Sequence, residues 1–430
     1  MDITDLYRIF LKTRKVSTDT RSDLEGSIFF ALKGASFDGN TFVEQAFAKG
    51  AVCCVIDNPD YHVPQKTILV DDVLKTLQQL ATFHREQYNI PVLAITGSNG
   101  KTTTKELVNA VLSTTYKTTC TKGNLNNHIG VPLTLLSMSD DVEFAIVEMG
   151  ANHPQEIDFL CHIAKPNFGL ITNIGKAHLE GFGGFEGVVK TKNELYQYIA
   201  QNSGTLFVNQ DDTLLSDLSK DIQKTTYGMS SNADCQGHIA DMNPFLSLTV
   251  ELDGKAHVIN SKLIGVYNAP NILSAACIGN YFHVPAAKIV SALENYQPDN
   301  MRSQIEKRGS NTIILDTYNA NPTSMNAALD NFFMLDFPRK AVILGDMLEL
   351  GAWSMEEHEK IINKLKNSTI DEVFLVGEHF KRLQKSCDFN CFDDVDELVH
   401  FFEQKQIADT LILIKGSRGV RLEKILKTFE

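Results

Sequence analysis

The chain lacks any hydrophobic run long enough to cross a membrane, and it lacks an excess of positive charge. No uninterrupted apolar stretch approaches about 18–20 residues, the length that a membrane-spanning helix needs. Residues 1–5 are acidic rather than basic, so we expect no secretory leader and a cytoplasmic location. The net charge of −13 argues against nucleic acid as the main partner, although it leaves room for a local basic pocket that binds an anionic substrate.

The chain also lacks a metal-binding cysteine pattern, internal repeats and low-complexity segments. Eight cysteines are present, but neither the adjacent Cys53 and Cys54 nor the pair Cys387 and Cys391 belongs to a set with zinc-ligand spacing. Several of the cysteines lie in apolar runs. We therefore expect reduced, buried thiols rather than a metal or redox site.

Length and composition predict a multidomain α/β protein. The 430 residues, 43% of them apolar and 22% charged, are too many for one core and fit two or three domains. Strand patterns alternate with helical ones, which predicts mostly parallel sheets with helices on both faces, whereas a turn at Asp253-Gly254 predicts a hairpin. We predict a small N-terminal α/β domain over 1–88, a central P-loop ATPase-like domain over 89–300 ending in a linker at 297–300, and a C-terminal Rossmann-like domain over 301–430.

A phosphate-binding loop is the most informative motif. An apolar run over 92–95 meets Thr96-Gly97-Ser98-Asn99-Gly100-Lys101-Thr102-Thr103, and a helical pattern follows. The glycines let backbone N–H groups turn toward phosphate oxygens, Lys101 supplies a charge for the terminal phosphates, and the Thr102 hydroxyl can hold Mg²⁺. An ordinary strand–helix turn is the alternative, but the context on both sides favours nucleotide binding. Ile95 replaces the first glycine of the common motif, so this is not the usual GTPase or motor variant.

Three charged residues are candidates for the same sheet edge. Glu148 ends a hydrophobic strand, where a carboxylate can bind Mg²⁺ or simply mark the strand end. His178 lies in a glycine-containing loop and is a candidate second metal ligand, although a lone histidine is more often structural. Lys192 lies in the next helical pattern, and in isolation it would be interpreted as a solvated lysine.

Several polar loops predict ligand contacts. The Asn- and Gly-rich stretch 121–134 suits a sugar, peptide or phosphate, and a turn-rich connection is the alternative. In the third domain, the loops 316–322, 345–351 and 415–419 each follow a predicted strand. Three such loops predict one shared cleft, whereas each alone could be a surface turn.

Together these motifs resemble the ATP-dependent Mur ligases of bacterial cell-wall synthesis. The resemblance rests on the phosphate loop, Glu148, the loop that carries His178 and the helix that carries Lys192, and it extends over essentially the whole chain. The third-domain loops and the Asn-rich stretch are similar to those of the member that joins D-alanyl-D-alanine to UDP-N-acetylmuramoyl-tripeptide. The motifs that match its nucleotide-sugar domain are Asp19-Thr20-Arg21, Ala31-Leu32-Lys33-Gly34 and Phe37-Asp38-Gly39.

The resemblance implies a role for each matching position. Lys101, Lys192 and His178 would be catalytic, and Thr102, Glu148, His178 and Lys192 would hold two Mg²⁺ ions, with Lys192 carbamylated as in many Mur ligases. Besides the loop residues 97–103, the nucleotide would be bound by Asn271, Arg302 and Asp316. The residues implied in substrate binding are Thr20, Arg21, Lys33, Asp38, Asn124, Asn126, Asn127, Tyr318 and Asn319.

The activity that the resemblance implies is amide formation driven by ATP through an acyl phosphate. We expect a monomer whose substrates are UDP-N-acetylmuramoyl-tripeptide and D-alanyl-D-alanine. A sister ligase that adds a single amino acid, or a folate polyglutamate-type ligase, is one alternative. A nucleotide-binding regulatory protein without ligase activity is the other.

Overall fold

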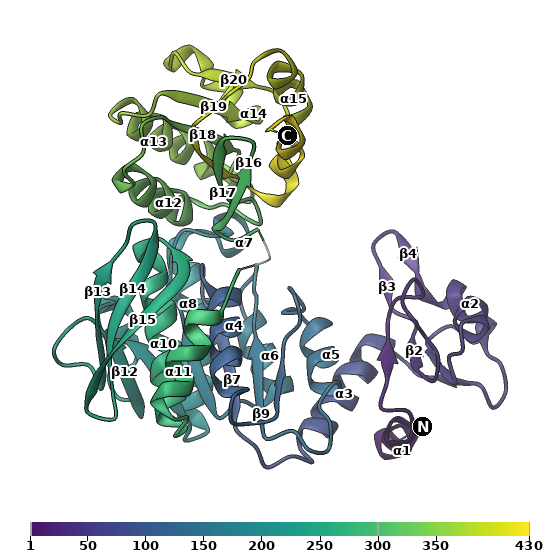
Figure 1. The fold of residues 1–430 in the computed structure, drawn as a ribbon. Helices are drawn as coiled ribbons and strands as arrows, with labels where there is room; N and C mark the ends of the chain where they lie inside the picture. The colour runs from purple at the N-terminus through teal and green to yellow at the C-terminus, as the bar shows by residue number, and fades with distance from the viewer. Residues whose placement is uncertain (1, 299–300, 430) are drawn as a thin grey trace.

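The computed structural model describes residues 2–298 and 301–429, and three main sheets follow one another along the chain. Figure 1 shows the C-terminal unit above the central one and the N-terminal unit to the side. The predicted α/β class is confirmed. Of the predicted linker 297–300, Asp299 and Asn300 lie outside the described residues. No helix among the described residues is long and apolar enough to span a membrane.

The N-terminal unit is a small parallel sheet of order β1-β2-β5-β6 with a separate two-stranded hairpin. Its core strands are fully buried because apolar side chains occupy every position of β2 and β5. Its strands are β1 (Val16–Ser17), β2 (Ile28–Phe30), β5 (Cys53–Ile56) and β6 (Thr67–Leu69), its hairpin is β3 (Lys33–Gly34) with β4 (Phe37–Asp38), and its helices are α1 (Ile3–Thr13), α2 (Val43–Ala48) and α3 (Val73–Arg85).

The central unit is a nine-stranded sheet of order β15-β14-β13-β12-β11-β10-β7-β9-β8. Strands β8 to β13 pair in parallel, and the predicted hairpin, β14 with β15, adds antiparallel strands to the β13 edge. The strands are β7 (Val92–Thr96), β8 (Thr118–Cys120), β9 (Phe144–Glu148), β10 (Phe168–Ile171), β11 (Thr205–Asn209), β12 (Lys224–Gly228), β13 (Cys235–Asp241), β14 (Phe245–Leu252) and β15 (Lys255–Ile264).

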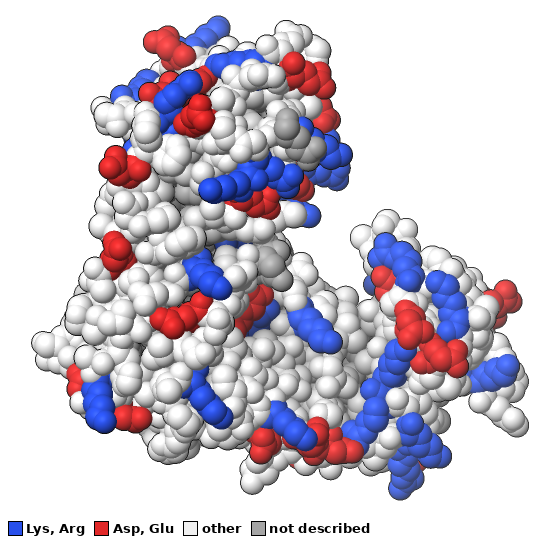
Figure 2. Space-filling model, in the orientation of Figure 1, with Lys and Arg blue, Asp and Glu red and all other residues white. Residues whose placement is uncertain are grey.

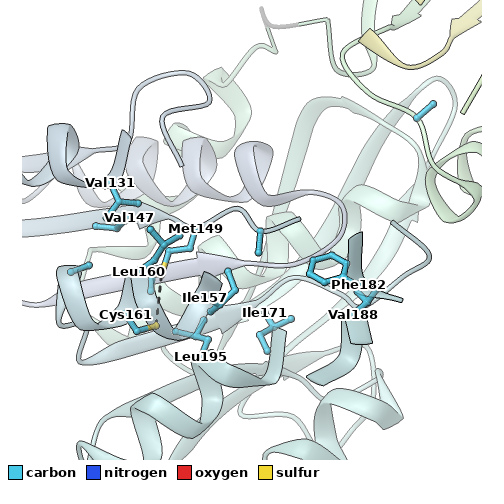
Figure 3. Packing of buried hydrophobic residues seen from close by; sticks show 14 of the residues in the cluster. Val131, Val147, Met149, Ile157, Leu160, Cys161, Ile171, Phe182, Val188 and Leu195 are labelled. Carbon is cyan, nitrogen blue, oxygen red and sulfur yellow. Dashed lines mark hydrogen bonds between the residues drawn. The ribbon is translucent and has the colours of Figure 1, made fainter. Parts of the chain in front are cut away.

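Helices cover both faces of this sheet. On one face, α4 packs against α10 and α11 over a core that includes Leu107 and Val111. On the other face, α5, α6 and α8 bury residues such as Val131, Leu160 and Leu195 against β9 and β10 (Figure 3). The helices are α4 (Lys101–Leu112), α5 (Gly130–Leu136), α6 (Glu156–Ala164), α7 (Leu179–Phe182), α8 (Phe185–Gln201), α9 (Thr213–Leu218), α10 (Ala269–Tyr281) and α11 (Ala286–Asn295).

The C-terminal unit is a six-stranded sheet of order β16-β17-β21-β18-β19-β20, parallel except at the β16 edge. The strands are β16 (Gln304–Arg308), β17 (Asn311–Asp316), β18 (Lys340–Gly345), β19 (Glu372–Val376), β20 (Asn390–Phe392) and β21 (Leu411–Lys415). Its helices are α12 (Pro322–Met334), α13 (Ser354–Lys366), α14 (Glu378–Arg382) and α15 (Val395–Gln404).

The topology of the central sheet creates a crevice beside β7. The chain leaves β7, reaches β8 and β9 on one side, and then continues to β10 on the other side. Ligands bind at such a switch point, outside the carboxyl ends of the strands. The chain segments that leave β7, β9 and β10 therefore meet at one place.

Candidate active site

The loop between β7 and α4 has the backbone of a phosphate cradle. Gly97 and Gly100 have φ angles of 145° and 79°, and residues that carry a side chain rarely adopt this backbone conformation. A Cβ on Gly97 would lie 2.0 Å from the Thr172 hydroxyl oxygen, and one on Gly100 would lie 2.9 Å from Asn271 Oδ1. The loop therefore requires glycine at both positions.

The segment after β10 holds this loop in place. The backbone N–H of Ser98 donates to the carbonyl of Asn173, and that of Asn99 donates to Asn173 Oδ1, both at 3.0 Å. The Thr172 hydroxyl donates to the Asn99 carbonyl at 2.6 Å, and the Ser98 hydroxyl donates to the Gly175 carbonyl at 3.0 Å. Hydrogen bonds to the segment after β10 therefore fix the shape of the phosphate loop. Electrostatic stabilisation of a phosphate requires donors that are fixed in advance in this way.

Lys101 bonds to its own loop. Its Nζ donates to the carbonyl oxygens of Gly97 at 2.7 Å and Ser98 at 3.2 Å. Burial lowers the pKa of Lys101 to about 8, with Glu148 opposing the shift and Arg302 adding to it. Phosphate oxygens at the loop would restore the charged form.

Glu148 presents a buried oxygen to the same space. The side chain is 1% exposed, and Oε1 accepts hydrogen bonds from Asn126 Nδ2 at 2.7 Å and from the Thr102 hydroxyl at 3.3 Å. Among the described residues, Oε2 has no hydrogen-bond partner. A buried carboxylate oxygen without a hydrogen bond, close to a hydroxyl, fits a hard cation such as Mg²⁺, which prefers oxygen ligands.

The two other predicted metal ligands have different surroundings. His178 Nδ1 lies against a carboxylate oxygen of Glu349 in the C-terminal unit, and the imidazole lowers the pKa of Glu349. No group of three or more His, Cys, Asp or Glu side chains in the described part of the chain is arranged to hold a metal ion. A second metal site at His178 therefore stays a prediction.

Lys192 is a buried lysine on α8. The residue is 2% exposed, and its Nζ lies 5.6 Å from the centre of the Phe182 ring. Burial lowers the pKa of Lys192 well below its usual range, and the charge of Lys101 adds to this effect. A neutral amine at this position is nucleophilic, as carbamate formation with CO₂ requires.

The C-terminal unit supplies the opposite wall. The guanidinium of Arg302 stacks 3.8 Å from the centre of the Tyr318 ring, and Asp316 accepts a bond of 2.5 Å from Lys415, which is 2% exposed. From the central unit, Asn271 Oδ1 accepts from the Thr104 hydroxyl at 3.1 Å. A cleft of about 1280 Å³ lies between the walls, and the predicted residues that line it are 98–103, Asn124, Asn126, Asn127, Glu148, His178, Asn271, Arg302, Asp316, Tyr318 and Asn319.

The predicted N-terminal substrate residues do not line this cleft. In the described part of the N-terminal unit, Thr20 bonds to Gln45, Arg21 holds the pKa of Asp19 at about 2, and Lys33 bonds to Asp57 at 2.8 Å. Asp38 accepts from the backbone and side chain of Asn40. Lys33 and Asp38 lie on the β3–β4 hairpin, whereas Thr20 and Arg21 precede β2 and Thr20 contacts α2 through Gln45.

One predicted loop is absent from the cleft. Residues 345–351 do not line it. Asp346 accepts the backbone N–H groups of His379 and Phe380 at the start of α14, and Glu349 contacts His178. The expectation of one cleft shared by three loops is therefore corrected to two loops, 316–322 and the strand end at Lys415. Asn321 and Lys415 belong to two of the predicted ligand loops but received no individual role, and no local pattern marks Lys105, the buried lysine of α4.

These features define a class: a P-loop nucleotide-binding protein with a Rossmann-like C-terminal unit across the cleft. Three family models match the chain: "Mur ligase family, catalytic domain" over 12–85, "Mur ligase middle domain" over 95–279 and "Mur ligase, glutamate ligase domain" over 301–418. The chain belongs to the Mur ligase family.

Relatives and solved structures agree with this assignment. The chain is 35% identical to the UDP-N-acetylmuramoyl-tripeptide–D-alanyl-D-alanine ligase of Bacillus subtilis, over 96% of this chain and 92% of that protein. It is 33% identical to the ligase of the same name from Escherichia coli, over 96% and 93%. A crystal structure of MurF from Acinetobacter baumannii superimposes with a TM-score of 0.87 at 31% identity, over 97% and 93%, and MurF from Thermotoga maritima in complex with ADP with 0.84 at 26%, over 97% of each chain.

Proposed function

We propose that this protein is an ATP-dependent ligase that joins D-alanyl-D-alanine to UDP-N-acetylmuramoyl-tripeptide, a step of peptidoglycan precursor synthesis. The products are the UDP-linked pentapeptide, ADP and phosphate. The observation that carries the proposal is the pairing of the phosphate cradle and Glu148 on one wall with Arg302 and Asp316 on the other. Near-full-length likeness to ligases of this name supports the choice of substrates.

The reaction that fits this cleft has two steps. The terminal carboxylate of the tripeptide attacks the γ-phosphorus of ATP, the bond to the β,γ-bridging oxygen breaks, and an acyl phosphate and ADP form. The free amine of D-alanyl-D-alanine then attacks the acyl carbon, the C–O bond to phosphate breaks, and the amine loses a proton. Lys101 and the loop N–H groups stabilise negative charge on the phosphoryl oxygens, and the cleft orients the reactants.

The oxygen ligands offered by Glu148 and Thr102 fit Mg²⁺. Glu148 and Thr102 would hold one ion, and bound Mg²⁺ would neutralise phosphate charge. We also propose a second ion at His178 and Lys192, as the family resemblance implies. Since an ammonium would repel that ion, a carbamate on Lys192 is part of the proposal.

The division of labour among the units is also proposed. Residues 1–88 bind the UDP moiety through Thr20, Arg21, Lys33 and Asp38, residues 89–300 bind ATP, and residues 301–430 close the cleft with Asp316, Tyr318 and Asn319. Asn124, Asn126 and Asn127 face the substrate from the central unit. We further propose that the protein is cytoplasmic, because ATP and nucleotide-sugar precursors are metabolites of that compartment, and that it acts as a monomer.

Phosphate release from ATP tests the proposal. Release should require both UDP-N-acetylmuramoyl-tripeptide and D-alanyl-D-alanine, and mass spectrometry should find the pentapeptide. Release with a single amino acid in place of the dipeptide would move the assignment to a sister ligase. Absence of release with any amine would overturn the enzymatic proposal.

A further inference from the structure

Lys105 is a buried cation to which the proposed mechanism gives no role. It lies on α4 one turn after Lys101 and is 2% exposed. Burying a lysine is costly unless its charge is paired and hydrogen-bonded. The partners of this ammonium therefore indicate why the charge is there.

The contacts of Lys105 join two parts of the candidate site. Its Nζ donates to the carbonyl of Gly123 at 3.3 Å and lies 3.8 Å from Glu148 Oε2. Gly123 begins the loop that carries Asn124, Asn126 and Asn127, and Asn126 bonds to the other oxygen of Glu148. Glu106 Oε1 is also 3.8 Å away, but Glu106 Oε2 accepts a bond from the Tyr296 hydroxyl.

We propose that Lys105 is a positioning residue that ties the Gly123–Asn127 loop to Glu148. The inference rests on the proposed function, because it assumes that the loop contacts substrate. The ammonium fixes the loop through the Gly123 carbonyl and balances the charge of the Glu148 carboxylate, which is 1% exposed. The nucleotide side and the substrate side of the cleft would then be aligned by one buried cation.

Three variants separate this role from simple stability. Lys105→Met keeps the length and removes both the charge and the donor, whereas Lys105→Gln removes the charge and keeps a donor. Lys255→Met, at the exposed turn of the β14–β15 hairpin, is the matched control. For each variant, KM for every substrate and kcat are measured, with metal-free binding of UDP-N-acetylmuramoyl-tripeptide by calorimetry and amide hydrogen exchange of residues 121–130.

A positioning role predicts a specific pattern. Lys105→Met should raise KM and the dissociation constant for the UDP-linked tripeptide by at least about tenfold, and it should speed amide hydrogen exchange in 121–130. Lys105→Gln should raise KM and the dissociation constant by a smaller factor. KM for D-alanyl-D-alanine, and every constant of Lys255→Met, should stay within about twofold of the parent. A lower melting temperature with unchanged KM, dissociation constant and exchange would overturn the inference.

Two further outcomes are decisive. If Lys105→Met does not fold, Lys105→Gln carries the test with the same readouts, and unchanged values there would overturn the inference. If the parent enzyme binds the UDP-linked tripeptide but releases no phosphate with D-alanyl-D-alanine, the proposed function fails. The binding and exchange data still decide the role of Lys105 in that case.

Discussion

At the scale of single residues, the Lys101 ammonium forms hydrogen bonds with the backbone of the phosphate loop itself. The ammonium donates to the carbonyls of Gly97 and Ser98, which belong to the loop that phosphate would occupy. Because burial lowers the pKa of Lys101 to about 8, the residue loses its proton within an accessible pH range. Nucleotide binding and protonation must therefore be linked.

The first prediction is proton uptake on nucleotide binding. Phosphate charge raises the pKa of Lys101 above about 8, so at pH 9 the free site is mostly neutral and the bound site is charged. Affinity for ADP should fall as pH rises above about 8. Calorimetry at pH 9 in two buffers of different ionisation enthalpy should detect the proton. Lys101→Met should abolish the uptake, and uptake that survives this substitution would contradict the assignment.

The same lysine makes a separate contribution to the pH dependence of folding. The folded-state pKa of about 8 lies below that of a free lysine, so the unfolded chain binds more protons between the two values. The free energy of unfolding contributed by Lys101 therefore rises with pH through this window. Lys192, whose pKa is also lowered by burial, acts in the same direction.

The second prediction concerns Glu148. Glu148→Gln keeps the size and the acceptor for Asn126 but removes the charge that would bind Mg²⁺. We expect kcat/KM to fall by at least about 100-fold, and the Mg²⁺ concentration for half-maximal rate to rise. Glu251→Gln, exposed on β14, is the control and should leave both values unchanged. Equal Mg²⁺ dependence in Glu148→Gln and the parent would exclude Glu148 as a ligand.

The sequence predicts individual residues only where a local pattern surrounds them. Lys101 and Thr102 follow a strand and a turn, so the local sequence is enough to predict their place at the mouth of the cradle. Asp316 and Lys415 are 99 residues apart, and no local pattern announces their 2.5 Å contact. The pairing of His178 with Glu349 is likewise a long-range contact between units, and it could not be foreseen from either loop.

At the scale of elements, α12 connects the C-terminal unit to the phosphate loop. Its N-cap, Asn321, accepts from the backbone N–H of Ser324 at 2.9 Å through Oδ1 and donates to Asn99 Oδ1 at 2.7 Å through Nδ2. Lys176 and Glu357 form a second link at 2.7 Å. The start of one helix is thus both capped and joined to the nucleotide cradle.

The third prediction separates the capping of α12 by Asn321 from its hydrogen bond to Asn99. Asn321→Ser retains a good N-cap but is too short to reach Asn99, whereas Asn321→Ala loses both interactions. Asn321→Ala should lower the free energy of unfolding by about 1 kcal/mol relative to Asn321→Ser. Both should raise KM for ATP by about fivefold, the effect of one lost hydrogen bond. Denaturant unfolding and steady-state kinetics check this, and a rise in KM confined to Asn321→Ala would assign the effect to the cap.

The order of strands and helices is far easier to predict than their partners. The apolar run over 92–95, the strand pattern that ends at Glu148 and the turn at Asp253-Gly254 predict β7, β9 and the β14–β15 hairpin, and the structure contains all of these. The patterns do not show that this hairpin joins the same sheet as the phosphate loop, since strand pairing is set by tertiary contacts. The antiparallel edge strand β16 was missed for a related reason: its five residues are only partly buried or exposed, so they show no strong apolar run.

At the scale of the whole molecule, the N-terminal unit stands apart from the cleft. Figure 2 shows a hollow between the N-terminal and C-terminal units. The cleft is lined by residues of the central and C-terminal units, and no described residue before Ser98 contributes. A substrate whose UDP moiety is held near Lys33 and Asp38 must therefore bridge this hollow to place its peptide carboxylate beside ATP.

The fourth prediction is that substrates make the molecule more compact. A ligand that contacts two units favours arrangements in which both contacts form at once, and closure also keeps water from the acyl phosphate. The radius of gyration from X-ray scattering should fall when a nonhydrolysable ATP analogue and UDP-N-acetylmuramoyl-tripeptide are added together. ADP alone should change it less, because the cleft residues proposed to bind the nucleotide all lie outside the N-terminal unit. Arg21→Ala, at an exposed position of the N-terminal unit, should weaken the UDP contact and reduce the compaction at a fixed substrate concentration. No change with both ligands, at concentrations where calorimetry shows both bound, would mean that the N-terminal unit does not approach the cleft during the reaction.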